Sequence, residues 1–359
     1  MTNSIDTSLI NYGLVGQLAI GTENIQQNLD TLTTEVGTGL ISNTYAGLGS
    51  GAGISLDLSP QVAALQTYQT NISSATGQMG VMQAAMTQIG SIATNLAAAL
   101  PTLNNLDPAN VDSVAANARQ SLQQVADLLN TQDGGVYIFI GQDSGNPPVP
   151  SGDNILTSGF FSQINSAVGQ LTTNGAAATD AATLLIASSN DPSTTPFSTY
   201  LSQGPAAAQS VVTGNGSAVT TGILANSNTA IVSGGTDTTG SYMRDLMRAL
   251  ATVGSLSSSQ ADDPNFAELI EDTTGSLNDA VSAMNADIGV MGDRQTELTN
   301  IGSTMASTST ALSGQISTAQ DADMASTLSR LTAVQTQLQA SYRLINTAQT
   351  LTLANFLPV

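Results

Sequence analysis

The sequence has no cysteine, no histidine and no tryptophan, and aromatic residues make up only 4% of its 359 residues. Without cysteine the chain can form neither a disulfide nor a thiolate metal site, and without histidine the most common general base is missing. The six basic residues are all arginine and the formal net charge is −20, which argues against a nucleic-acid-binding surface. The composition favours long helices joined by loops of small residues.

The sequence also lacks a long apolar run and a basic leader. No apolar stretch approaches the ~18 residues that a membrane-spanning helix needs. The first residues, MTNSIDTSLINYG, contain no basic segment followed by an apolar one, as a Sec-type signal requires. We therefore expect no membrane insertion and no cleaved signal of that type.

Few residues are left for chemistry. The candidates for acid–base or metal sites are three carboxylate groups: Asp262 and Asp263; Glu268, Glu271 and Asp272; and Asp321 and Asp323. The first group has the pattern of a helix cap, the second suits the positive end of a helix, and the third lacks the other ligands of a calcium loop. The glycine-rich residues 37–53 lack the lysine of a phosphate-binding loop, and they are expected to form a flexible or bulged connector instead. We expect no catalytic residue, no metal and no cofactor, and the chain is predicted not to be an enzyme.

Both ends of the sequence carry apolar residues at steps of three, four and seven, which lie along one stripe of a helix. In the first stretch, where Thr22 is the polar exception, they are Val15, Leu18, Ile25, Leu29, Leu32 and Val36. In the last stretch they are Met324, Leu328, Leu331, Leu338, Tyr342 and Ile345, followed by Leu351, Leu353, Phe356 and Leu357. Such helices are marginal alone, because their stability comes from packing the stripe against a partner. We predict that these residues form an assembly surface.

The charges at the two ends have opposite signs. Glu23, Asp30 and Glu35 are the charges of the predicted first helix, whereas Arg330 and Arg343 are the charges that follow residue 323. The two helices could therefore pair with a weak electrostatic preference. Exposed ion pairs contribute roughly 0–1 kcal/mol each, so apolar packing must dominate.

Further helices are predicted between the ends. The seam of the first, which Pro101 is expected to stop, includes Ile72, Met79, Met82, Met86, Ile89 and Leu96. A second helix begins after Asp107-Pro108, and the short connection predicts an antiparallel hairpin. A long helix that starts near residue 263 has a seam that includes Ile288, Met291 and Leu298. We predict that these residues form the core of a helical rod.

The middle of the chain has a different pattern. Residues 136–140, VYIFI, lie after a Gly-Gly pair and are predicted to form a buried strand. Residues 154–240 are rich in Ser, Thr, Ala, Gly and Asn, with one short helix expected near residues 161–171. Residues 210–213 and 218–224 flank Asn-Gly, the typical turn of a β-hairpin. Helical spacing returns at Tyr242.

The predicted fold class is mainly α, with a discontinuous, coiled-coil-like helical bundle rod built from both chain ends and a small mixed α/β insert. We divide the chain into terminal helices of an inner assembly core (residues 1–45 and 320–359), a helical rod (46–133 and 241–319) and an exposed insert (134–240).

Four segments resemble the flagellin family in its broad sense of bacterial flagellar filament and hook–filament junction proteins. Residues 32–40, LTTEVGTGL, match its L-x-x-x-x-x-T-G segment, and residues 75–89, ATGQMGVMQAAMTQI, resemble its first rod helix. Residues 288–298, IGVMGDRQTEL, are similar to its G-x-x-x-x-R-x-x-L stretch, with one additional residue between Arg294 and Leu298. The most specific match is at the C-terminus, where SYRLINTAQTLTLANFL resembles the terminal helix of the family.

Two segments of the insert resemble the junction group of that family, the hook-associated proteins, more than filament flagellins. Residues 136–148, VYIFIGQDSGNPP, are similar to its Y-x-F-x-G segment with a following Pro-Pro, and residues 220–226, TTGILAN, also resemble its insert. The resemblance favours a hook–filament junction protein, with filament flagellin as the alternative within the family. The alternative from another class is a secreted coiled-coil adhesin or surface protein.

The resemblance implies a structural role in the bacterial flagellum and motility. It implies secretion through type III export as an unfolded chain, an export chaperone on the C-terminal helix, and terminal helices that order on self-assembly. The implied partners are other copies of the chain and other axial subunits, namely hook-associated proteins and flagellin.

Overall fold

The computed structural model describes the backbone of residues 7–103, 108–214 and 216–353, and the side chains of these residues except 7–15, 109 and 348–353. The chain forms two compact units. The terminal unit comprises Met1–Gln66 and Ala306–Val359, and the central unit comprises Thr67–Met305. Two long helices, α2 (Gly51–Leu103) and α9 (Phe266–Gln320), contribute residues to both units. The mainly α fold predicted from the sequence is confirmed, whereas the division into three functional regions stays a prediction.

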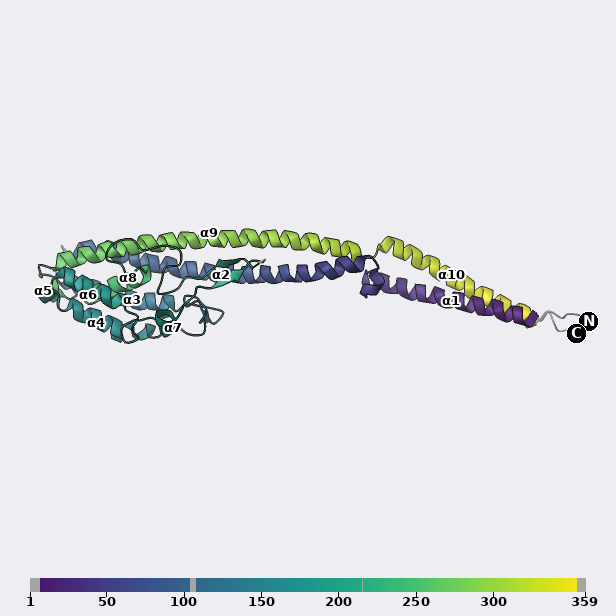
Figure 1. The fold of residues 1–359 in the computed structure, drawn as a ribbon, viewed down its shortest axis with the longest axis horizontal. Coiled ribbons are helices and arrows are strands. Elements are labelled where there is room, and N and C mark those ends of the chain that lie inside the picture. The colour runs from purple at the N-terminus through teal and green to yellow at the C-terminus, as the bar shows by residue number, and fades with distance from the viewer. Residues whose placement is uncertain (1–6, 104–107, 215, 354–359) are drawn as a thin grey trace, which may run out of the picture. The chain divides into compact units, whose positions relative to one another are not determined.

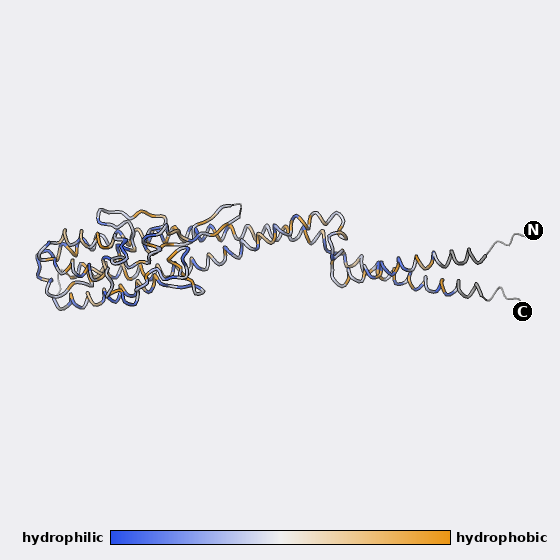
Figure 2. The backbone as a smooth tube through the Cα atoms, turned by 60° about the horizontal axis from the view of Figure 1, so that its bottom comes forward, coloured by the Kyte–Doolittle hydropathy of each residue, from blue (hydrophilic) through white to orange (hydrophobic). Residues whose placement is uncertain are grey.

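The terminal unit is built on two helices from opposite ends of the chain, α1 (Thr7–Thr38) and α10 (Met324–Leu353), which lie side by side in Figures 1 and 2. They run antiparallel, because the β-bridge between Leu40 and Asp321 joins the end of one to the start of the other. Two backbone hydrogen bonds flank this bridge: Ile41 N–H donates to the Gln320 carbonyl at 2.7 Å, and Ala322 N–H donates to the Gly39 carbonyl at 2.8 Å. The junction therefore fixes the register of the two helices.

A short connection links α1 to α2. Gly39 has φ of 74°, a left-handed angle that ends helices readily. A single turn of 3₁₀-helix, η1 (Tyr45–Leu48), follows, with Thr44 as its N-cap. The expectation that the whole glycine-rich stretch is a connector is wrong, because α2 starts at Gly51 and includes Gly53.

Helix α2 also extends further than expected at its other end. It ends at Leu103, two residues after Pro101, which was expected to stop it. Proline itself has a helical φ, so it removes one hydrogen bond of the ladder without preventing the last turn from forming. Helix α3 (Pro108–Leu129) begins at the predicted Asp-Pro signal. A groove lined by residues 88–92 of α2 and 124–128 of α3 shows that the two helices lie antiparallel, as predicted.

In the central unit, α9 packs along α2. Gln295 Nε2 donates to the Thr76 carbonyl at 3.4 Å, and a Cβ added at Gly90 would lie 3.4 Å from the Met284 methyl group. Helix α8 (Tyr242–Gly254) is buried along its whole length and contacts α3, α4 (Gly159–Val168) and α6 (Ala176–Ser188). The core of the central unit therefore surrounds α8.

The rest of the central unit consists of short elements. Their bounds are β1 (Gln132–Asp133), β2 (Val136–Tyr137), η2 (Gly152–Thr157), α5 (Leu171–Asn174), α7 (Thr199–Gln203), β3 (Ser210–Val212), β4 (Ala218–Thr220) and η3 (Ser258–Gln260). Strands β1 and β2 form one antiparallel pair, and β3 and β4 form another in which Val211 lies opposite Val219. The predicted β-hairpin is confirmed, with shorter strands than expected.

The predicted strand at residues 136–140 is correct only for its first two residues. Ile138, Phe139 and Ile140 leave the ladder and bury their side chains in the core. Their backbone finds other partners, since Ile138 N–H donates to the Thr131 carbonyl at 3.3 Å and the Phe139 carbonyl accepts from Ala225 at 2.8 Å. An apolar run between glycines does not distinguish a strand from an irregular buried segment.

Candidate assembly surface

The inner stripe of α1 faces α10. Thr22 and Leu32 are buried, and the remaining described residues of the predicted stripe are half-buried, namely Leu18, Ile25, Leu29 and Val36. Thr22 is tolerated there because its hydroxyl donates to the Leu18 carbonyl at 2.8 Å. The spacing of three and four residues therefore places these side chains on one face, as amphipathic helices do.

The inner stripe of α10 differs from the apolar pattern of its sequence. Leu331, Leu338 and Ile345 are half-buried, but Leu328 and Tyr342 are 47% and 45% exposed. The intervening positions of the stripe are taken by Thr327, which is buried, and by Val334 and Ser341, which are half-buried. Small polar residues thus share the contact with α1 and leave larger apolar ones outside.

The side chains of four predicted assembly residues lie outside the described part of the structure. The described backbone of α1 and α10 includes Val15 and Leu353, whose side chains are not described, and Phe356 and Leu357 lie beyond the last described residue. Their role in assembly stays a prediction.

The terminal unit exposes large apolar side chains. Ile20 on α1 is 62% exposed, Leu56 on α2 is 60% exposed, and Leu344 on α10 is 58% exposed. Isolated apolar residues on a surface are ordinary, whereas contiguous ones mark an interaction surface, and here Ile20 and Leu344 belong to the two paired helices α1 and α10. This unit therefore offers apolar area to a partner.

Several threonine hydroxyl groups of α1 and α10 donate hydrogen bonds to the backbone of their own helix. Thr31, Thr33, Thr34 and Thr38 of α1 each donate to the carbonyl four residues earlier at 2.7–2.9 Å. Thr332, Thr336 and Thr347 of α10 do the same at 2.8–3.0 Å. This back-bonding satisfies the hydroxyl within its own helix.

The predicted rod-core residues are mostly buried in the central unit. Eight are buried: Ile72, Met79, Met82, Met86, Ile89, Leu96, Met291 and Leu298. Ile288 is only half-buried, and its neighbour Asp287 is buried in its place. Asp287 accepts hydrogen bonds from the backbone N–H groups of Thr229 and Ala230 and from the hydroxyl of Tyr242, at 2.9–3.1 Å.

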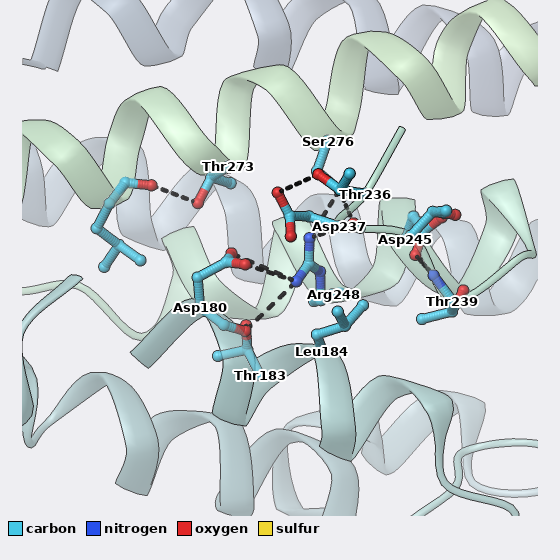
Figure 3. A network of polar contacts seen from close by, with 12 residues as sticks. Asp180, Thr183, Leu184, Thr236, Asp237, Thr239, Asp245, Arg248, Thr273 and Ser276 are labelled. Atoms are coloured by element: carbon cyan, nitrogen blue, oxygen red, sulfur yellow. Dashed lines mark hydrogen bonds and ion pairs between the residues drawn. The ribbon is translucent and has the colours of Figure 1, made fainter. Parts of the chain in front are cut away.

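Helix α8 carries a buried polar network that the sequence did not reveal. Arg248 forms an ion pair with Asp180 at 3.3 Å, and donates to the Asp237 carbonyl at 3.0 Å and to Ser276 Oγ at 2.7 Å (Figure 3). The guanidinium thus joins α6, α8, α9 and the segment before α8. The pair of Arg248 and Asp180 is the one ion pair among the described residues.

A second arginine of α8 is held in the same way. Arg244 donates to the carbonyls of Ala187 and Ser189 at 2.9 and 3.1 Å and to Asn190 Oδ1 at 2.7 Å. Its guanidinium also lies 5.2 Å from the centre of the Phe197 ring. No local signal in the sequence marked these residues, because Arg244, Asp245 and Arg248 share one face of α8, a pattern typical of a solvent-exposed helix face.

The electrostatics of the network indicate structure rather than catalysis. Burial raises the pKa of Asp180, with Asp237 acting in the same direction and Arg248 against it. Burial and the nearby Asp287 carboxylate raise the pKa of Tyr242. Each of these groups is occupied by hydrogen bonds within the fold.

The described residues contain no group of three or more His, Asp or Glu placed to bind a metal ion, and no described helix is long and apolar enough to cross a membrane.

A solved structure from Vibrio parahaemolyticus, of a protein assigned as a flagellar hook-associated protein, is similar with a TM-score of 0.50 and 10% sequence identity. The similarity covers 74% of this chain and 95% of the other. At this identity the likeness shows the fold alone. No curated protein matches the chain.

Two family models match the sequence itself. The bacterial flagellin N-terminal helical region matches residues 17–144, and the bacterial flagellin C-terminal helical region matches residues 272–357. Together they cover more than half of the chain and include α2, α3, α10 and most of α1 and α9. Proteins of this family are structural, non-enzymatic subunits that assemble with one another and with other axial subunits. The chain therefore belongs to the bacterial flagellin family and is a structural component of the bacterial flagellum.

Proposed function

We propose that the chain is a hook–filament junction protein, which polymerises through its terminal helices and connects the hook to the filament. The observation that carries this proposal is the packing of the two insert segments that resemble junction proteins. The Ala225 N–H donates to the Phe139 carbonyl at 2.8 Å, so residues 220–226 lie against residues 136–148.

The same region depends on one glycine of the Y-x-F-x-G segment. Gly141 has φ of 76°, and a Cβ at this position would lie 2.2 Å from the Ala207 carbonyl oxygen. The Gly141 carbonyl accepts from Gln209 Nε2 at 3.0 Å. The Ile223 N–H, in the other segment, points at Met82 Sδ of α2 at 3.3 Å. The two segments are thus a buried structural unit anchored to α2, which supports a subgroup role for them.

The fold comparison supports the same subgroup, because the similar protein from Vibrio parahaemolyticus is assigned as hook-associated.

We also propose that the chain is exported unfolded and that a chaperone binds α10 before export. The exposed apolar residues of α10 support the chaperone. An unfolded chain that leaves through the flagellar export channel carries this helix without its partner α1, so a chaperone that covers it would prevent aggregation. The absence of cysteine suits export as an unfolded chain.

The test is electron microscopy of a strain that lacks this chain. A junction protein predicts hooks without filaments, with flagellin released into the medium, and the wild-type sequence supplied on a plasmid should restore filaments. Hooks that still carry full filaments would contradict the proposal. Absence of the filament with no flagellin released, together with thousands of copies of this chain in purified filaments, would instead identify it as the filament flagellin.

A truncation tests the role of the terminal helices. Deletion of residues 328–359 should abolish incorporation into flagella, because α1 loses the helix that covers its stripe. Far-UV circular dichroism of the truncated chain should still show the cooperative melting of the central unit. Incorporation of the truncated chain would contradict a role for α10 in assembly.

A further inference from the structure

The terminal unit has charges of opposite sign that do not pair with each other. Glu23 and Asp30 on α1 and Arg343 on α10 are exposed. The one ion pair among the described residues is in the central unit, so none of these three groups forms an ion pair with another described residue. The sequence predicted that the two ends could pair through these charges, and the structure does not show such a pair.

Glu23 and Arg343 nevertheless lie at nearly the same height along the helix pair. Gln26 Nε2 donates to the hydroxyl of Tyr342 at 2.6 Å, which places residues 26 and 342 at one level. Glu23 lies three residues from Gln26, and Arg343 lies one residue from Tyr342 in the matching direction. At ~1.5 Å per residue, the two charged residues are about 3 Å apart along the axis.

The two side chains point to opposite faces of the pair. At ~100° per residue, Glu23 lies about 140° around α1 from the stripe that contacts α10, and Arg343 lies about 160° around α10 from the stripe that contacts α1. Each helix therefore covers the inner face of the other and carries its charge on its own outer face. Asp30, seven residues after Glu23, adds a second carboxylate to the acidic face.

We propose that Glu23 on one copy of the chain binds Arg343 on the next copy, and that this contact sets the axial register between neighbouring copies. The inference rests on the proposed assembly through the terminal helices and names the residues that make the contact. Because the acidic and basic faces lie on opposite sides of the pair, one copy docks through its acidic face on the basic face of the next. Such a heterologous contact builds rings or helical filaments, not a closed two-fold dimer.

Apolar neighbours give the contact its affinity. Ile20, one turn before Glu23, and Leu344, next to Arg343, are the most exposed large apolar side chains of α1 and α10 among the described residues. A second copy that covers them excludes water from the ion pair and strengthens its electrostatic attraction. The ion pair then selects the register, since charge complementarity contributes more to specificity than to affinity.

The test uses two full-length variants, Glu23→Arg and Arg343→Glu, and the critical concentration for self-assembly measured by sedimentation in low salt. Either variant alone places like charges on both outer faces, and its critical concentration should rise about tenfold, the factor given by one unfavourable contact of ~1.4 kcal/mol. An equimolar mixture of the two variants should assemble within about threefold of wild type. In the mixture, each copy finds the opposite charge on its neighbour, which like-charged copies of a single variant cannot provide.

The matched control is Asp57→Arg, which makes the same charge change at an exposed position of the terminal unit on α2. It should leave the critical concentration unchanged. In ~1 M salt, where the screening length falls to about 3 Å, the single variants should approach wild type.

Three results would overturn the inference. Single variants that assemble like wild type would show that the charges do not meet. A mixture that stays unassembled, while the double variant Glu23→Arg with Arg343→Glu recovers, would show that the pair forms within one chain. Both results leave the proposed junction function intact. Failure of the wild-type chain to assemble under any salt condition, even in the presence of purified hooks, would reject the proposed function and this inference together.

Discussion

Replacing Arg248 by methionine should strongly destabilise the central unit. The substitution keeps an unbranched side chain on α8 but removes the guanidinium that binds Asp180, the Asp237 carbonyl and Ser276. Asp180 would then be a nearly buried carboxylate without its cation, surrounded by other carboxylates. Breaking a buried ion pair by removing one partner costs about 3–5 kcal/mol.

That loss is large compared with the stability of a domain. For a unit of this size, a change of 1 kcal/mol shifts the melting temperature by about 2–4 °C. The Arg248→Met variant should therefore melt about 6–20 °C below wild type. Circular dichroism at 222 nm gives the melting curve, and urea titration gives the free energy of unfolding.

The matched control is Arg294→Met on α9. Arg294 is partly exposed and makes no hydrogen bond or ion pair among the described residues, so its loss should cost less than ~0.5 kcal/mol. The double variant Arg248→Met with Asp180→Asn removes both charges and should recover about 1–3 kcal/mol relative to the sum of the single losses. Equal stability of the Arg248 and Arg294 variants would refute the view that the network around α8 holds the central unit together.

The remaining predictions concern three other buried groups. Gly141→Ala should cost about 2 kcal/mol or more in urea unfolding, since it combines a left-handed φ with a clash against a backbone carbonyl, whereas Gly145→Ala at an open turn should be neutral. Tyr242→Phe should cost about 1.5–3 kcal/mol, because it removes a hydrogen bond to the buried carboxylate of Asp287. Burial raises the pKa of Asp180 above its ordinary 3.8, so the folded chain binds this proton more readily than the unfolded chain, and the free energy of unfolding should fall as the pH rises through the raised pKa. Asp180→Asn should flatten that part of the pH dependence.

Each of these has a contradicting outcome. A Gly141→Ala variant as stable as Gly145→Ala would mean that the segment relaxes freely. A Tyr242→Phe variant as stable as wild type would mean that water replaces the hydroxyl. A free energy of unfolding that rises with pH above 3.8, and does so equally with asparagine at position 180, would mean that Asp180 is charged and well solvated in the fold.

The helical framework could be predicted because its causes are local. Apolar spacing located α1, the Asp107-Pro108 signal marked the start of α3, and the start expected near residue 263 lies within three residues of the start of α9. The contact face of α10 was harder, because Leu328 and Tyr342 are apolar yet exposed, whereas Thr327 lies in the seam. Apolarity shows which residues gain from burial, but the partner helix decides which of them obtain it.

The core of the central unit could not be predicted, because its polar groups are satisfied by distant partners. In the sequence, Arg244 and Arg248 resemble a solvent-exposed helix face. In the fold they are buried, because the carbonyls of residues 187, 189 and 237 accept hydrogen bonds from them. Helix α6 was missed for a related reason. Its alanines and threonines have weak preferences, and contacts with α4 and α8 supply its stability.

The back-bonded threonines of α1 and α10 alter how another subunit meets these helices. In each, the hydroxyl already has its hydrogen-bond partner in the preceding turn. A neighbouring molecule that covers such a residue strips little water from it and orphans no donor, so the usual cost of burying a polar group is largely avoided. A threonine-rich helix can therefore dock against another protein surface with a desolvation cost nearly as low as that of an alanine-rich helix.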